Sequence, residues 1–305
     1  MIAGVTTALV LAANPVEHVI NHKFIVDDGG WWLWSGHVGN LILSGLIMIF
    51  GFNWLASKIA TGDESLGHGR YVARGKLAHM LEVICVYLRE NTVRPMLGER
   101  TRAFMPYLWT LFFFILVNNL LGLIPIGDLL HLLVPSWKAS HSLPLGGTAT
   151  QNLFVTAVLA LISAVVINVA GVISMGPMGY VKHLTAGTPP YLWALMVPIE
   201  IMGTIIKPVA LALRLFANMT AGHILLATLL MFAVQGLDML VGKSPLIGAP
   251  VTLISVGGAI AITFLELFVA FLQAFVFMFL TTVFIAQLSH HDEEHGHGHE
   301  HAHAH

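Results

Sequence analysis

Charged side chains are scarce in this chain. Asp, Glu, Lys and Arg make up 10% of the 305 residues, whereas a soluble globular domain has about 25%. Hydrophobic residues make up 56%, and the formal net charge is −2. The chain has no basic arm and no interleaving of aromatic and basic residues, so nothing indicates a nucleic-acid partner. This composition predicts an integral membrane protein.

Cysteine is also nearly absent, and this excludes several kinds of site. Cys85 is the single cysteine, so the chain has neither an internal disulfide nor a CxxC-type metal site. Walker, nucleophile-elbow and metal-hydrolase motifs are missing as well. We therefore expect no ATP chemistry, no catalytic residues and no cofactor on this chain.

Long apolar runs dominate what remains. A membrane-crossing helix needs about 20 apolar residues. Six runs are long enough: 31–57, 103–126, 152–176, 189–206, 211–232 and 251–288. The fourth and fifth read as one helix, because a helix-compatible pattern continues from the Thr188 cap and Pro189 to about Gln235. The prediction is an all-α membrane protein with about five crossings.

The last two predicted helices are about twice as long as a membrane is thick. Either they break, with Lys207-Pro208 as the candidate position, or they cross at a steep tilt. Two adjacent oversized helices predict a long tilted hairpin over residues 189–288.

The positions of the basic residues predict the orientation. Eight of the 14 Lys and Arg residues lie between Lys58 and Arg102, so this segment is predicted to be cytoplasmic. Residues 1–30 then form an external N-terminal segment, residues 31–288 a membrane domain and residues 289–305 a cytoplasmic tail. Within the basic segment, the pattern from Leu66 to Arg102 is typical of an amphipathic helix at the cytoplasmic interface.

Arg214 lies alone in an apolar run. A guanidinium keeps its charge at any attainable pH, and holding it in hydrocarbon costs from about 3 to more than 10 kcal/mol. Glu200, Lys207 and Arg214 are seven residues apart, so they share one face of a helix, and Asn218 extends it. The stripe predicts a path for charge, although a structural ion pair is the alternative.

The second long helix carries matching polar residues. Glu266 and Gln273 are seven residues apart and lie on one face. Folding the hairpin at its Gly- and Pro-containing loop places Gln273 at the depth of Arg214, and Glu266 at the depth of His223 nearer the outside. A histidine facing a carboxylate can exchange a proton near neutral pH. Alternatively, Gln273 only joins the helices and His223 is a satisfied core residue.

The tail is rich in histidine without a fixed spacing. Neutral imidazoles bind Zn²⁺ or Ni²⁺, so weak metal binding is one interpretation, and a disordered tail without a role in transport is the favoured one. The residues are His290, His291, His295, His297, His299, His301, His303 and His305.

The run Leu213-Arg214-Leu215-Phe216-Ala217-Asn218-Met219-Thr220-Ala221-Gly222-His223, with Gln273 downstream, resembles the corresponding motif of a known family, subunit a of the F-type ATP synthases. The likeness extends over nearly the whole chain. Its motifs are residues 213–223 (Leu-Arg-Leu-Phe-Ala-Asn-Met-Thr-Ala-Gly-His), 272–277, Lys207-Pro208, Glu200, 118–125 and 14–18.

The resemblance implies a proton-translocating stator subunit beside a rotating ring of small hairpin c subunits. Arg214 matches the arginine that faces the ring carboxylate and separates two aqueous half-channels. Asn218 and Gln273 match its polar neighbours, and Glu200 matches an acidic residue of the cytoplasmic half-channel. Lys207 lies on the same helix face and is a further candidate for the proton path.

The outer half-channel departs from some relatives. His223 and Glu266 match a pair that some bacterial relatives carry in the reverse order, and the His-first order resembles alphaproteobacterial and mitochondrial forms. Bacterial relatives often have Asp where this chain has Gly122. Asp128 or His131 are therefore candidates for lining the outer vestibule.

The resemblance also implies partners and a location. It implies contacts with the c ring, peripheral-stalk b subunits and membrane lipid, and an indirect link to the soluble ATPase sector, in a bacterial plasma (inner) membrane. The alternatives are a stand-alone secondary ion or metal transporter and a membrane scaffold. Five crossings without an internal repeat are few for a transporter.

Overall fold

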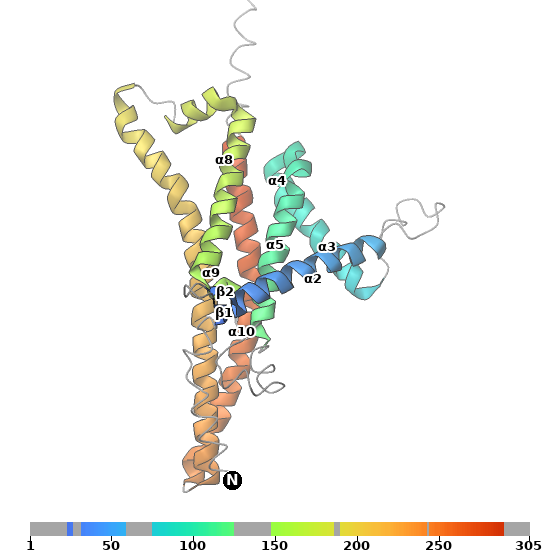
Figure 1. Cartoon of the computed structure of the whole chain (residues 1–305), viewed down its shortest axis with the longest axis vertical. Helices are drawn as coiled ribbons and strands as arrows, with labels where there is room; N and C mark the ends of the chain where they lie inside the picture. Colours follow the sequence, from blue (N-terminus) through green and yellow to red (C-terminus); the bar gives the residue numbers. More distant parts are fainter. Residues whose placement is uncertain are drawn as a thin grey trace, which may run out of the picture. The chain divides into compact units, whose positions relative to one another are not determined.

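The computed structural model of the chain describes residues 23–26, 32–58, 75–124, 148–185, 190–242 and 244–289 (Figure 1). Its long helices are α2 (Gly36–Lys58), α5 (Thr101–Leu123), α8 (Leu153–Leu184), α9 (Trp193–Val241) and α10 (Pro245–Ser289). The shorter elements are β1 (Lys23–Val26), β2 (Trp32–Ser35), α3 (Lys76–Tyr87), η2 (Leu88–Val93), α4 (Arg94–Leu97), η3 (Gly98–Arg100), η4 (Ala149–Gln151) and η5 (Pro190–Leu192).

Five helical segments of the described chain are long and apolar enough to cross a membrane. They are Gly36–Lys58, Lys76–Leu123, Leu153–Ile173, Trp193–Val241 and Pro245–Gln287. The predictions of an all-helical membrane fold and of five crossings are confirmed, and the protein is a multi-pass membrane protein.

The two oversized helices are continuous. α9 has 49 residues and α10 has 45, so each is about 70 Å long, about twice the hydrocarbon thickness. α9 runs through Pro198 and Pro208 without interruption, so the break considered at Lys207-Pro208 is absent. A proline removes one backbone hydrogen bond, and neighbouring groups can compensate for that loss in a membrane helix.

Some boundaries differ from the prediction. Lys23–Val26 pairs with Trp32–Ser35 as an antiparallel ladder, and the first membrane helix begins only at Gly36. The apolar strand residues on either side of an Asp- and Gly-rich sequence are a hairpin signal that is too short to stand out among long apolar runs.

α8 continues to Leu184, beyond a kink at Gly176, where φ is 70° and ψ is 163°. Glycine tolerates this positive φ without a steric penalty.

The chain divides into two compact units, and the long helices contribute segments to both. Unit 1 comprises residues 1–46, 115–156 and 213–273, and unit 2 comprises residues 47–114, 157–212 and 274–305. Each unit is described by itself below.

In unit 1, the last two helices pack together near their connection (Figure 1). A side chain at Gly236 would place its Cβ 2.6 Å from Thr252 Oγ1, and one at Gly248 would collide with the backbone of Leu240. Small residues therefore let the two backbones approach closely, as they commonly do between membrane helices.

In unit 2, the predicted amphipathic helix packs beside α2. Leu55 and Ala78 are buried together, with Phe52 and Leu81 packed against them. The helix is present from residue 76, and the first part of the predicted stretch lies outside the described residues. Ile84 is half-buried, and the other large apolar side chains of the helix are exposed: Leu77, Met80, Val83, Val86 and Tyr87.

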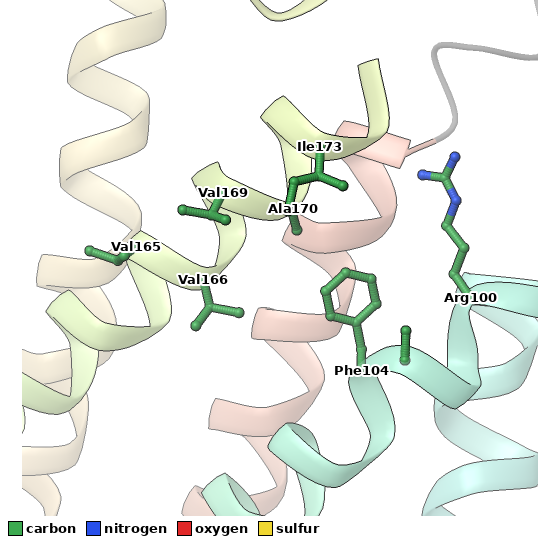
Figure 2. A pocket seen from close by; sticks show the side chains of 8 residues that line it. Arg100, Phe104, Val165, Val166, Val169, Ala170 and Ile173 are labelled. Atoms are coloured by element: carbon green, nitrogen blue, oxygen red, sulfur yellow. The ribbon is translucent and has the colours of Figure 1, made fainter. Parts of the chain in front are cut away.

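Unit 2 also contains an open cavity of about 530 Å³ between α5 and α8 (Figure 2). Apart from Arg100, its lining is apolar: Ala103, Phe104, Val165, Val166, Val169, Ala170 and Ile173. A hydrogen bond of 2.9 Å from Tyr107 Oη to Ser163 Oγ joins the same two helices. None of the predicted functional residues lines this cavity.

Candidate functional site

His223 and Glu266 face each other in unit 1. His223 Nδ1 lies 4.0 Å from Glu266 Oε1, and the two side chains are only 14% and 7% exposed. This closeness depends on Gly222, because a Cβ there would lie 2.5 Å from Glu266 Oε1. Glu266 Oε2 has no hydrogen-bond partner among the described residues. The two groups face each other just beyond hydrogen-bonding distance, so a small side-chain movement would bring together an imidazole and a carboxylate, which can exchange a proton near neutral pH.

The other ring nitrogen of His223 also has a partner. Thr148 Oγ1 lies 2.9 Å from His223 Nε2, and Thr148 is 1% exposed. Thr148 immediately precedes η4 and has an extended backbone. Three side chains from three segments of unit 1 thus form a row: Thr148, His223 and Glu266.

Asn218 and Gln273 form a second polar contact in unit 1. Asn218 Nδ2 donates to Gln273 Oε1 over 3.0 Å. Gln273 is fully buried, and its Nε2 has no hydrogen-bond partner among the described residues. Gln273 was predicted to lie opposite Arg214, and its contact is instead one helical turn away, at Asn218.

Arg214 has a different environment. Its side chain is exposed on α9, whereas the adjacent Leu215 is completely buried. In the described part of the chain it makes no hydrogen bond or ion pair. The alternative of a structural ion pair within the chain therefore has no support among these residues. A permanent charge is presented outward from an apolar helix.

Glu200 and Lys207 lie on the same helix, in unit 2. The Lys207 Nζ is 5.0 Å from the centre of the Phe284 ring, a cation–π contact that partly stabilises this charge. Glu200 is half-buried. Burial, and then the negative charge of Glu200, raise the pKa of the Tyr180 phenol. Tyr180 donates its hydroxyl hydrogen to Asn168 Oδ1 across the kink of α8.

Four buried polar residues near this site received no role from the sequence: Thr148 contacts His223, and the other three form hydrogen bonds with one another or with the backbone of α9 and α10. Besides Thr148, these are Asn119, Thr150 and Gln151, which are buried in unit 1. A cluster of polar residues directly before an apolar helix, and two asparagines within an apolar run, were the available signals, because buried polar groups need hydrogen-bond partners.

Several predicted residues lie outside the described residues. These are Asp128 and His131 of the outer vestibule, the N-terminal segment up to residue 22, and the histidines of the tail from residue 290. Their roles stay predictions.

Known proteins resemble this chain over most of its length. Residues 38–286 match the family described as ATP synthase A chain. ATP synthase subunit a of Myxococcus xanthus is 43% identical over 251 residues, which is 80% of this chain and 73% of that protein. The Chloroherpeton thalassium subunit a is 41% identical over 253 residues, 80% of this chain and 67% of that protein. The subunit a of Chlorobium phaeobacteroides strain BS1 is 37% identical over 287 residues, 93% of this chain and 75% of that protein.

These relatives are bacterial, and the expected affinity with alphaproteobacterial and mitochondrial forms stays a prediction. The family match covers α9, α10 up to residue 286 and every described site residue named above. The chain therefore belongs to the family of subunit a, the non-catalytic proton-channel subunit in the membrane sector of F-type ATP synthases.

Proposed function

We propose that this subunit forms two half-channels that lead protons to and from a carboxylate on a ring of small hairpin c subunits, with Arg214 between them. The observation that carries the proposal is the environment of Arg214. Its charge lies in an apolar run, is exposed on α9 and has no acidic partner among the described residues.

An isolated guanidinium in hydrocarbon costs from about 3 to more than 10 kcal/mol. An acidic group on another subunit would remove this cost, because a guanidinium binds a carboxylate through two parallel hydrogen bonds. This acidic group would bind Arg214 only in its deprotonated, carboxylate form. A permanent charge at this position would also repel protons and so prevent a direct leak between the half-channels.

The outer half-channel would pass His223 and Glu266, and protons would reach the ring near Asn218 and Gln273. Their pairing within one packed hairpin supports this route. After rotation of the ring, protons would leave toward the cytoplasm past Glu200. The cluster of basic residues between residues 58 and 102 supports an orientation with the N-terminus outside and the tail in the cytoplasm.

The energy of one proton sets the scale of the coupling. One elementary charge moved through 100 mV releases about 2.3 kcal/mol. Several protons must therefore pass for each ATP that the soluble ATPase sector makes, and this subunit would be linked to that sector only indirectly.

The exposed apolar face of α3 suits a further contact of the same complex. Leu77, Met80, Val83 and Val86 remain exposed after α3 has packed on α2. We propose that peripheral-stalk b subunits and membrane lipid cover this face at the cytoplasmic side of a bacterial plasma membrane. The ion pairs of Glu90 with Arg89 and Arg94 would then lie at the aqueous edge.

Arg214→Ala in the complete complex tests the proposal. We expect ATP-driven proton pumping and proton-driven ATP synthesis to be lost in proteoliposomes, while the complex still assembles. Arg214→Lys should fail largely too, because an ammonium is a compact charge that can lose its proton when desolvated. Arg102→Ala is the matched control, since Arg102 is an exposed arginine in the first turn of α5. ATP synthesis by Arg214→Ala at the Arg102→Ala rate would refute the proposal.

A further inference from the structure

The partner of the second ring nitrogen of His223 decides which way that ring faces. An imidazole linked only to Glu266 can rotate or flip, and its proton can occupy either nitrogen. Thr148 Oγ1 lies 2.9 Å from Nε2, while Nδ1 lies 4.0 Å from Glu266 Oε1. The two contacts together orient the ring between α10 and the segment that carries Thr148.

Thr148 is held in place by the residues that follow it. Thr150 Oγ1 donates to Asn119 Oδ1 over 2.8 Å, and Asn119 Nδ2 donates to the carbonyl oxygen of Ala270 over 3.3 Å. Gln151 Nε2 donates to the carbonyl oxygen of Met219 over 3.5 Å. η4 is thereby fastened to α5, α9 and α10 within unit 1.

The space beside Thr148 is provided by a glycine. A Cβ at Gly122 would collide with Oγ1, Cβ and Cγ2 of Thr148. Any larger residue at position 122 would therefore displace the hydroxyl from His223. Gly122, where an acidic residue was expected from the resemblance, is the residue that permits the contact between Thr148 and His223.

We propose that Thr148 is a positioning residue for proton transfer between His223 and Glu266. Its hydroxyl is both a donor and an acceptor. It can donate to an unprotonated Nε2, or accept from Nε2–H when the ring is the other tautomer or the imidazolium. One hydrogen bond is therefore kept in every protonation state, and Nδ1 stays directed at Glu266.

The proton balance is simple in this arrangement. The ring proton is on Nε2 and is donated to Thr148. When the two side chains close from 4.0 Å to hydrogen-bonding distance, the lone pair of Nδ1 accepts a proton from the neutral carboxyl of Glu266. This step leaves an imidazolium and a carboxylate. The imidazolium then returns one proton to the carboxylate or to water. Thr148 exchanges no proton with the path, and it acts only through the orientation of His223.

The test measures proton transport by the complete complex in proteoliposomes, normalised to the assembled complex. Thr148→Val keeps the shape and removes the hydroxyl. We expect a loss of about two- to tenfold, which is the effect of one hydrogen bond of ordinary strength, and an altered pH profile of transport. Thr148→Ser restores a hydroxyl and should recover most of the rate and the original profile.

Thr156→Val is the matched control. Thr156 is equally buried in unit 1, and within the described part of the chain its hydroxyl bonds only to the carbonyl oxygens of Asn152 and Leu153. Its loss should leave both the rate and the pH profile close to wild type.

Gly122→Ala is the second variant: it retains Thr148 but displaces the hydroxyl, so it should lower transport by a similar factor. It should cause no further loss in a Thr148→Gly background.

The inference rests on the proposed function, and the His223→Ala background separates the two. If His223→Ala transports normally, the proposed relay is wrong. If His223→Ala is impaired but Thr148→Val and Gly122→Ala transport at wild-type rate, only the role of Thr148 is wrong. An equal loss from Thr148→Val with and without His223 would show a purely structural role and would also overturn the inference.

Discussion

The coupling between His223 and Glu266 provides the sharpest test of the proposed relay. The perturbation is a double-mutant cycle of His223→Ala and Glu266→Ala, together with the exchanged variant His223→Glu with Glu266→His. If the two residues act as one site, the double replacement costs less than the two single losses combined.

The geometry gives the magnitude. In the imidazolium–carboxylate state that proton transfer creates, two unit charges 4.0 Å apart attract each other by about 4 kcal/mol at an effective dielectric constant of about 20. The pair is desolvated and only part of this attraction is net, so a coupling of about 1–3 kcal/mol is expected, within the usual range for residues in contact. In transport rate this corresponds to a deviation from additivity of about five- to 150-fold.

The assay is the initial rate of ATP-driven proton uptake into vesicles that contain equal amounts of assembled complex. ATP hydrolysis by the soluble sector alone is the control, because neither substitution touches that sector. The exchanged variant should retain more transport than either single replacement, since it restores one imidazole and one carboxylate. Strictly additive losses, with the exchanged variant no better than the single ones, would refute the relay.

Two further variants test the packing of the hairpin. Gly222→Ala should leave assembly intact, since alanine favours a helix over glycine by about 1 kcal/mol. It should nevertheless slow transport, because its Cβ would lie 2.5 Å from Glu266 Oε1; transport at the wild-type rate would show that this contact is not needed. Cysteines replacing Asn218 and Gln273, in a variant without Cys85, should cross-link with a short reagent, since their side chains are in contact. A pair at 218 and 266 should not, because seven residues add about 10 Å of rise, and the reverse result would show a different register.

The membrane class and the helices could be predicted because their signals are local. An apolar run of sufficient length must form a helix in a membrane, where every backbone group needs an internal hydrogen bond. The lone Arg214 is equally conspicuous, since a permanent charge stands out in such a run. That His223 and Glu266 face each other could be predicted from helical periodicity and one antiparallel turn. Both rules hold along long, continuous helices.

What surrounds that pair depended on tertiary structure. Thr148 is 75 residues from His223 and lies in a segment without periodicity, so no sequence pattern brings the two together. The axial register of the two helices decides that Gln273 contacts Asn218, and a shift of one turn along the axis leaves the pattern of residue spacing unchanged. Close approaches decide how the polar side chains fit together. Glu266 fits because residue 222 is a glycine without a side chain, and Thr148 fits because residue 122 is also a glycine. Such complementarity is a property of packed surfaces, and it exists only once the helices are in place.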